Sequence, residues 1–150
     1  MGVAVRPVAA ADREDWFRLW RGYLAFYGAE LSDGISEQTW TRLLDRDAPV
    51  WGLVAVKDGP DAAVVGIVNC VLHANTWTDR PVCYLEDLFV DPEQRGAGTG
   101  RALIEAVIAS ARKHRWHRVY WMTKQDNAAA RHLYDKVADA TDWVRYDAHM

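Results

Sequence analysis

The chain of 150 residues is long enough for one domain with a buried core, and its composition, half hydrophobic and 26% charged, is that of an ordinary globular protein. The net charge of −3 gives nucleic-acid binding no electrostatic support. No apolar run approaches the ~20 residues of a membrane span, and the first residues lack the apolar core of a signal peptide. We therefore expect a cytoplasmic protein with a single domain over residues 1–150, in which Cys70 and Cys83 remain free thiols.

The N-terminal third of the chain predicts one strand and two helices. The strand is expected over residues 3–6, and Asp12 can cap a helix that Gly28 would end. Ser36 is expected to start a second, shorter helix. In the first helix apolar residues recur at helical spacing and form a largely aromatic stripe, which consists of Trp16, Leu19, Trp20, Tyr23, Leu24 and Tyr27.

The remaining two thirds of the chain predict strands that are separated first by a turn and a loop, and then by helices. The strands are expected over residues 51–56, 63–72, 84–90, 118–122 and 141–148. The helices are expected over residues 98–114 and 127–136. An antiparallel hairpin run followed by a β-α-β unit favours an α/β fold, with a mixed, mostly antiparallel sheet flanked by helices.

A glycine-rich loop joins the fourth predicted strand to the helix that follows it. Gly96, Gly98 and Gly100 let the backbone approach a ligand, and the free N–H groups and dipole of a helix start favour an anion such as phosphate. The loop differs from a dinucleotide fingerprint, whose third glycine would fall at Arg101, and from a Walker A loop, whose Gly-Lys-Ser/Thr the chain lacks. A surface turn that only caps the helix is the alternative interpretation.

Three blocks of sequence resemble one known family. Arg95, Gly98 and Gly100 match the pattern R/Q-x-x-G-x-G/A, which resembles the acyl-CoA loop of the GNAT N-acetyltransferase superfamily. Residues 85–92 resemble the fourth strand of that family, and residues 127–134 resemble its N-x-x-A-x-x-x-Y helix. The motifs look most similar to those of diamine or polyamine and small histone-type acetyltransferases. The resemblance implies a GNAT-like acyl-CoA N-acyltransferase fold that uses acetyl-CoA (coenzyme A) as co-substrate and no metal, and that has neither nucleic acid nor membrane as a partner.

The resemblance also implies roles for individual residues. Glu86 would take a proton from the acceptor amine through a water, and Tyr134 would donate a proton to the departing thiolate. Strand alternation places Glu86 on one face with Leu88 and Val90, and Asp87 on the other, unless a bulge of the kind usual in this family intervenes. The residues expected to bind the CoA are Leu88, Phe89, Val90, Gln94, Arg95, Gly96, Ala97, Gly98, Thr99, Gly100, Arg101, Asn127 and Lys136.

The acceptor is expected to be a small cationic amine or an amino acid. The end of the aromatic stripe at Tyr27, together with Glu30 and Asp87, would bind a cation through aromatic faces and charge, although such a stripe is more often core. A protein lysine or N-terminus is the alternative acceptor. A non-catalytic acyl-CoA-binding regulatory module is the alternative of a different class, and it would need neither Glu86 nor Tyr134.

The end of the chain departs from the family pattern. GNAT proteins usually have two strands after the tyrosine helix, whereas this chain has room for one clear strand over residues 141–148. An unpaired sheet edge invites pairing with another chain. We therefore expect a homodimer, in which the sequence leaves open whether the last strand is exchanged.

Overall fold

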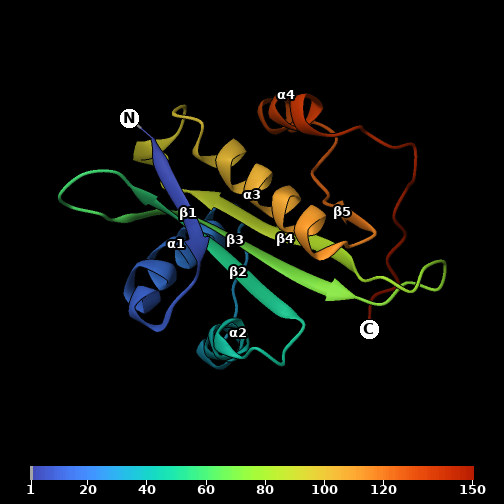
Figure 1. Ribbon diagram of the computed structural model, residues 1–150, viewed down its shortest axis with the longest axis horizontal. Helices are drawn as coiled ribbons and strands as arrows, with labels where there is room; N and C mark the ends of the chain where they lie inside the picture. Colours follow the sequence, from blue (N-terminus) through green and yellow to red (C-terminus); the bar gives the residue numbers. More distant parts are fainter. Residues whose placement is uncertain (1) are drawn as a thin grey trace.

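The computed structural model describes residues 2–150, which form a five-stranded sheet with helices on both faces (Figure 1). The strands lie in the order of the chain: β1 (Val3–Pro7), β2 (Val50–Lys57), β3 (Val64–His73), β4 (Val82–Val90) and β5 (Arg118–Tyr120). The helices are α1 (Arg13–Phe26), α2 (Asp33–Leu44), α3 (Thr99–His114) and α4 (Ala128–Val137), with short 3-10 turns η1 (Ala10–Asp12) and η2 (Pro92–Gln94). Strands β1 to β4 are antiparallel and β5 is parallel to β4, which confirms the predicted mixed, mostly antiparallel sheet.

Each face of the sheet has its own hydrophobic core. On one face, α1 and α2 pack with buried Trp16, Trp20 and Trp40, so the N-terminal part of the predicted aromatic stripe is core. On the other face, α3 packs with the buried residues Leu103, Ile104 and Val107. Burying each of these large side chains contributes about 1.5–3 kcal/mol to the free energy of unfolding. The sheet, including β4, is therefore covered by a hydrophobic core on each face.

Strand β4 contains a β-bulge at Glu86. Asp87 pairs with Asn69 of β3, but the next residue of β3, Cys70, pairs with Leu85, so Glu86 is an extra residue on β4. A bulge of this kind reverses the alternation of side chains beyond it.

The bulge decides which way the carboxylates of β4 point. Leu85 and Leu88 both pack on the α3 core, whereas Phe89 packs on the α1/α2 core. The two residues between the leucines, Glu86 and Asp87, therefore both turn toward the α1/α2 face. The predicted alternation, which placed Glu86 on the same face as Leu88 and Val90, is therefore wrong. The β-bulge that was expected to interrupt this alternation is confirmed.

The pairing of β4 with β5 stops early. It covers only the pairs Val82–Arg118, Cys83–Val119 and Tyr84–Tyr120. Beyond Tyr84, β3 is the only strand that β4 pairs with among residues 2–150. The C-terminal half of β4 thus presents a backbone edge that runs toward the glycine loop.

The predicted last strand over residues 141–148 is wrong. Residues 138–150 form no helix or strand, and the side chains of Trp143 and Tyr146 are 82% and 91% exposed. A strand-like pattern becomes a strand only where another strand satisfies its backbone N–H and C=O groups, and none pairs with this segment. Strand β5 is likewise shorter than predicted.

Two helix starts also differ from expectation. Helix α2 begins at Asp33 and is capped by Ser32, while Ser36 lies inside it and accepts a hydrogen bond from Trp20 Nε1 at 3.0 Å. Asp12 does precede α1, but its carboxylate binds the Arg6 guanidinium at 2.7 and 2.8 Å instead of capping the helix. Within residues 2–150, every helix is too short or too polar to cross a membrane.

Candidate functional site

The glycine loop has the backbone conformation that an anion site needs. Gly96 and Gly98 have φ angles of +85° and +83°, a region that residues with a Cβ rarely adopt, and a Cβ added to either would meet nothing within 4 Å. Gly98 is the N-cap of α3, and the first helical hydrogen bond runs from Ala102 N–H to the Gly98 carbonyl. The N–H groups of Thr99, Gly100 and Arg101 therefore precede the helical ladder and point out of the start of a 16-residue helix.

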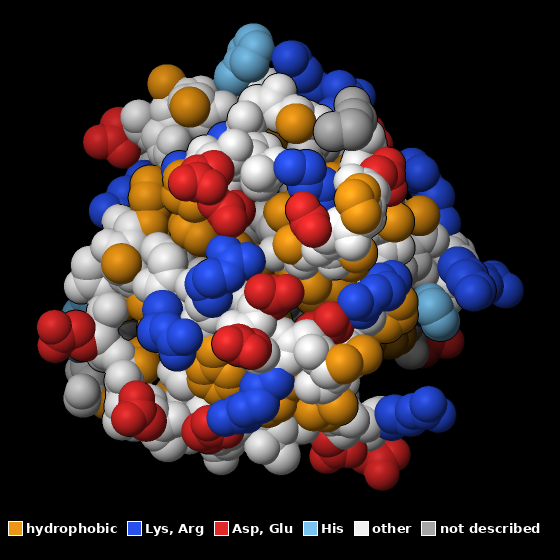
Figure 2. All heavy atoms as spheres, turned by 90° about the vertical axis from the view of Figure 1, so that its left-hand side faces the viewer, with side chains coloured by type: hydrophobic (Ala, Val, Ile, Leu, Met, Phe, Trp, Pro, Cys, Tyr) orange, Lys and Arg blue, Asp and Glu red, His pale blue; other side chains and the backbone are white. Residues whose placement is uncertain are grey.

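The side chains around this loop hold it in place. Arg95 donates from Nε to the Val90 carbonyl at 3.2 Å, and its guanidinium lies 5.3 Å from the ring centroid of Phe89 and 5.8 Å from that of Phe26. Arg95 thus ties the loop to α1. Arg101 forms an ion pair with Glu105 at 2.8 Å on the first turns of α3. Basic and acidic side chains are intermixed on the face that carries the loop (Figure 2).

The other residues predicted to bind CoA lie on β4, in the loop and on α4, and they differ in burial. Leu88 and Val90 are half-buried against the α3 core, and Phe89 is buried on the opposite face. A Cβ added to Gly22 would lie 2.8 Å from the Phe89 ring, so glycine lets α1 approach β4 closely. Thr99 is buried, Gln94 is half-buried, and Ala97 and Lys136 are exposed.

Helix α4 brings Tyr134 toward the same end of β4. Asn127 caps this helix by accepting the Ala130 N–H at 3.3 Å, and it also donates to Thr123 Oγ1 at 3.3 Å. A Cβ on Gly100 would lie 3.7 Å from Leu133, so α4 packs beside the start of α3. Tyr134 itself packs edge-on against Trp121, with ring centroids 5.6 Å apart. Burial, and to a lesser extent Tyr27, raises the pKa of the Tyr134 phenol, which keeps this group a proton donor.

The two carboxylates on the α1/α2 face differ in their surroundings. Asp87 accepts a hydrogen bond from Asn69 Nδ2 at 3.2 Å, and Asn69 Oδ1 in turn accepts one from Trp16 Nε1 at 3.4 Å. Burial raises the pKa of Asp87, although hydrogen bonds from Tyr23 and Asn69 oppose the shift. Burial and the adjacent Asp87 charge raise the pKa of Glu86, which is more exposed than Asp87. A carboxylate with a raised pKa is a better proton acceptor, so Glu86 suits a base that solvent can reach.

The far end of the aromatic stripe forms a wall beside these carboxylates. Tyr23 stacks on Trp20 with centroids 5.4 Å apart, and Tyr27 lies 5.0 Å from Tyr23 with half of its surface exposed. Burial, followed by the charge of Asp87, raises the pKa of the Tyr23 phenol. Tyr27 therefore lies beside Tyr23, which interacts with Asp87, and it also acts on the pKa of Tyr134, whereas Glu30 lies in the exposed loop between α1 and α2.

Three residues that the sequence did not single out extend this face. Tyr84 and Tyr120 stack across the β4–β5 pair, with centroids 4.9 Å apart and planes 17° apart. His73 Nδ1 lies 2.9 Å from the Ala74 carbonyl oxygen, and His73 Nε2 lies 2.9 Å from Tyr120 Oη. This group could not be recognised from the sequence, because the pairing of β3, β4 and β5 brings together residues that are far apart in the chain.

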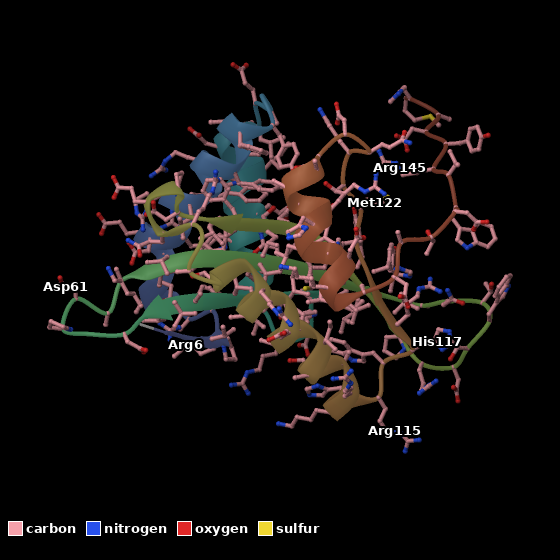
Figure 3. The ribbon with its side chains drawn as sticks, turned by 90° about the horizontal axis from the view of Figure 1, so that it is seen from above. Arg6, Asp61, Arg115, His117, Met122 and Arg145 are labelled. Carbon is pink, nitrogen blue, oxygen red and sulfur yellow. The ribbon has the colours of Figure 1, made fainter. Side chains whose placement is uncertain are left out.

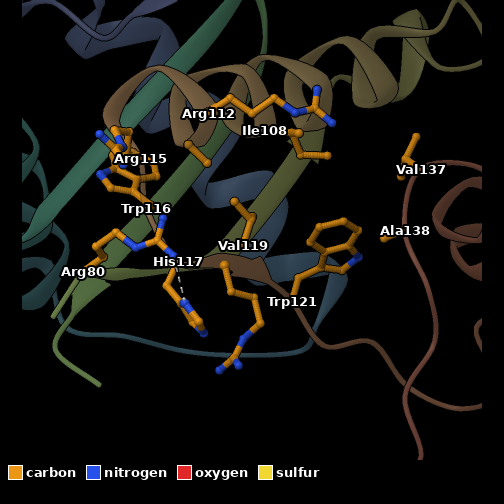
Figure 4. A pocket seen from close by; sticks show the side chains of 12 residues that line it. Arg80, Ile108, Arg112, Arg115, Trp116, His117, Val119, Trp121, Val137 and Ala138 are labelled. Atoms are coloured by element: carbon orange, nitrogen blue, oxygen red, sulfur yellow. Dashed lines mark hydrogen bonds between the residues drawn. The ribbon is translucent and has the colours of Figure 1, made fainter. Parts of the chain in front are cut away.

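A cavity lies away from the predicted site residues. It has a volume of about 440 Å³ and lies between the C-terminal end of α3, β5 and the end of α4 (Figure 4). Its lining includes Trp116, Arg112, Arg115 and Arg118, and none of the predicted site residues. Within residues 2–150, no three His, Cys, Asp or Glu side chains are grouped so that they could hold a metal ion.

Comparisons with known proteins identify the family. The sequence model of the acetyltransferase (GNAT) family matches residues 13–138. The chain is 33% identical to the D-amino-acid N-acetyltransferase HPA3 of Saccharomyces cerevisiae over 144 residues, which are 96% of this chain and 89% of that protein. The fold is similar to that of a ribosomal-protein-alanine N-acetyltransferase from Brucella melitensis (TM-score 0.77, 22% identity, 99% and 100% of the two chains). It is also similar to that of AAC(6')-Iy, solved with the bisubstrate analogue CoA-S-monomethyl-acetylneamine (TM-score 0.82, 19% identity, 100% and 99%).

The chain therefore belongs to the GNAT family and is an N-acetyltransferase. The finer resemblance to diamine, polyamine or histone-type enzymes remains a prediction.

Proposed function

We propose that this GNAT-family enzyme transfers an acetyl group from acetyl-CoA directly to the primary amine of a small molecule, either a cationic amine or an amino acid. One observation carries the proposal. The bulge at Glu86 places two carboxylates on the α1/α2 face at the point where β4 loses its β5 partner. The name of the relative HPA3, a D-amino-acid N-acetyltransferase, supports an amino-acid acceptor.

The residues around the glycine loop suit the donor. The N–H groups at the start of α3 would bind the pyrophosphate of acetyl-CoA, and the open edge of β4 at Leu88 and Val90 would bind its pantetheine arm. Arg95 would act by positioning the loop. Asn127 would act by fixing the start of α4, which carries Tyr134.

The α1/α2 face around Glu86, Asp87, Tyr23 and Tyr27 is the proposed acceptor face, and together with Tyr134 it would supply the proton transfers. An alkylammonium has a pKa of about 10.4, so Glu86 would take its proton through a water before the amine attacks the thioester carbon. The Leu88 N–H would stabilise the negative charge that builds on the carbonyl oxygen. When the C–S bond breaks, Tyr134 would donate its proton to the CoA thiolate and recover one from solvent.

An assay with acetyl-CoA and a panel of amines tests this function, with the release of free CoA thiol as the readout. The panel should hold polyamines, both enantiomers of several amino acids, and lysine-containing peptides. Turnover of small amines at millimolar concentration is the expected result. Turnover of peptides alone would favour the protein-acetyltransferase alternative, and CoA binding without any turnover would favour the regulatory module.

We also propose that the enzyme is a homodimer. Strand β5 is the last strand of the sheet, and the segment after α4 exposes Trp143, Val144 and Tyr146. Large exposed apolar side chains beside an open sheet edge are typical of an interface. Light scattering coupled to size-exclusion chromatography should give twice the 17.0 kDa mass of the chain, and a mass of one chain would exclude the dimer.

A further inference from the structure

The C-terminal segment returns to the acceptor face through Arg145. Its Nη1 lies 3.5 Å from the Sδ atom of Met122, which follows β5 closely in the chain. Figure 3 shows Arg145 beside Met122, with Arg115 and His117 well away from both. The segment after α4, residues 138–150, therefore places a guanidinium next to Met122, just beyond the end of β5 where β4 and β5 separate.

The register of the two strands places this guanidinium opposite Glu86. Tyr84 pairs with Tyr120, so Glu86 and Met122, each two residues further along, lie on either side of the point where the strands part. Trp121 packs toward the α3 core, while its neighbour Tyr120 stacks on Tyr84 on the acceptor face. Met122 is 44% exposed, and Arg145, which contacts its sulfur, also acts by its charge on Tyr84 of this face.

The pKa of Tyr84 is affected by charges from both sides of this opening, those of Glu86 and Arg145. Burial and then Glu86 raise the pKa of the Tyr84 phenol, while the positive charge of Arg145 acts in the opposite direction. Arg118 is another cation on this face, but it stacks over Tyr120 at 5.3 Å and precedes it in β5, on the side away from Glu86. The acceptor face thus has carboxylates on β4 and a guanidinium across the opening from them.

We infer that Arg145 binds the carboxylate of the acceptor, so that the enzyme selects amino acids over amines that lack a carboxylate. An amino acid presents its ammonium and its carboxylate on one carbon, which fits a site with Glu86 and Asp87 on one side and a guanidinium on the other. Arg145 already pairs with Asp147 through Nη2 at 2.8 Å. Among residues 2–150, its Nη1 has one hydrogen-bond partner, the sulfur of Met122, which is a weak acceptor that a stronger one can replace.

This inference rests on the proposed small-amine activity and is tested by comparing phenylalanine with phenylalaninamide, both enantiomers of each. The variants are Arg145→Ala, Arg145→Lys and, as a matched control, Arg118→Ala. Arg145→Ala should raise the KM of the amino acid roughly 10- to 100-fold, the range for losing a hydrogen bond to a charged group, and leave the KM values of the amide and acetyl-CoA unchanged. Arg145→Lys should recover part of the loss, because an ammonium keeps the charge but not the two-pronged geometry. Arg118→Ala should behave as wild type.

Three outcomes separate this inference from the function on which it rests. If Arg145→Ala changes the acid and the amide alike, or changes neither, Arg145 does not bind the carboxylate. If the wild type prefers the amide and simple amines to the acid, the enzyme stands and the amino-acid assignment falls. If the wild type acetylates neither substrate nor any other small amine, the proposed function itself is wrong. Thermal melting of each variant shows whether an effect reflects a loss of folded protein.

Discussion

The donor side and the acceptor side of the site meet at β4, but they are built from different parts of the chain. The part of the proposed donor side that would bind the pyrophosphate is one continuous segment, residues 94–101, whose positive-φ glycines expose the backbone at the start of α3. The proposed acceptor side would combine side chains of α1, β3, β4 and the segment after α4, namely Tyr23, Asn69, Asp87 and Arg145.

This difference has consequences for mutation. Binding through backbone N–H groups needs a particular φ angle and open space, so adding a side chain should weaken this binding more than removing one. Side-chain recognition needs charge and position, so a lost functional group harms it most. The two sides should therefore respond oppositely to the same kinds of substitution.

The largest effect is expected at Gly98. Gly98→Glu adds a Cβ at a φ of +83° and a negative charge where the pyrophosphate would lie, so acetyl-CoA binding measured by calorimetry should be nearly abolished. Gly59→Glu is the matched control, because Gly59 has a φ of +119° and open space but lies in the β2–β3 turn. Wild-type affinity in Gly98→Glu would remove the loop from the donor site.

Tyr134→Phe should have the next largest effect. Removing the proton donor should lower kcat by about 10²- to 10⁴-fold and leave the affinity for acetyl-CoA unchanged, since the ring and its contact with Trp121 remain. Tyr146→Phe, on the exposed tail, should not change kcat. An unchanged kcat in Tyr134→Phe, measured where chemistry limits turnover, would leave Tyr134 only a packing role.

Glu86→Gln should lower kcat by about 10²-fold at neutral pH. The wild-type rate should rise with pH as Glu86, whose pKa is raised by burial, loses its proton. The variant should recover part of its loss at high pH, where the amine deprotonates in solution. If the pH profiles of the variant and the wild type coincide, Glu86 is not the base.

The smallest effect is on stability and concerns Asp87. Because burial raises the pKa of Asp87 in the folded protein, ionising this carboxyl disfavours folding, and the associated stability is lost as pH rises through the raised pKa. Asp87→Asn should therefore raise Tm at pH 7, and the gain should vanish below the ordinary Asp pKa of about 3.9.

Asp12→Asn provides the opposite case for the same melting experiment. The hydrogen-bonded Arg6 guanidinium lowers the pKa of Asp12, so its contribution to stability is present at neutral pH and is lost as pH falls through the lowered pKa. Asp12→Asn should therefore lower Tm at pH 7. Matching pH profiles for the two variants would show that burial does not control the charge of Asp87.

The sequence by itself determined helices α3 and α4 and the glycine loop between β4 and α3. The extents of α3 and α4 and the cap at Asn127 follow from residue types and spacing along the helix, which act within a few residues. The positive φ angles at Gly96 and Gly98 are likewise open to glycine because of its own missing side chain. These features could be predicted because they need no distant partner.

Only the tertiary structure decided the acceptor face. One extra residue in β4 relative to β3 sends Glu86 and Asp87 to the same side, and strand patterns alone do not contain that register. The contacts that complete the face join residues that are far apart in the chain: Trp16 to Asn69 over 53 positions, His73 to Tyr120 over 47 and Met122 to Arg145 over 23. Residues 141–148 also show the effect of distant partners: they have a strand-like pattern, but they form no strand because no other strand pairs with them.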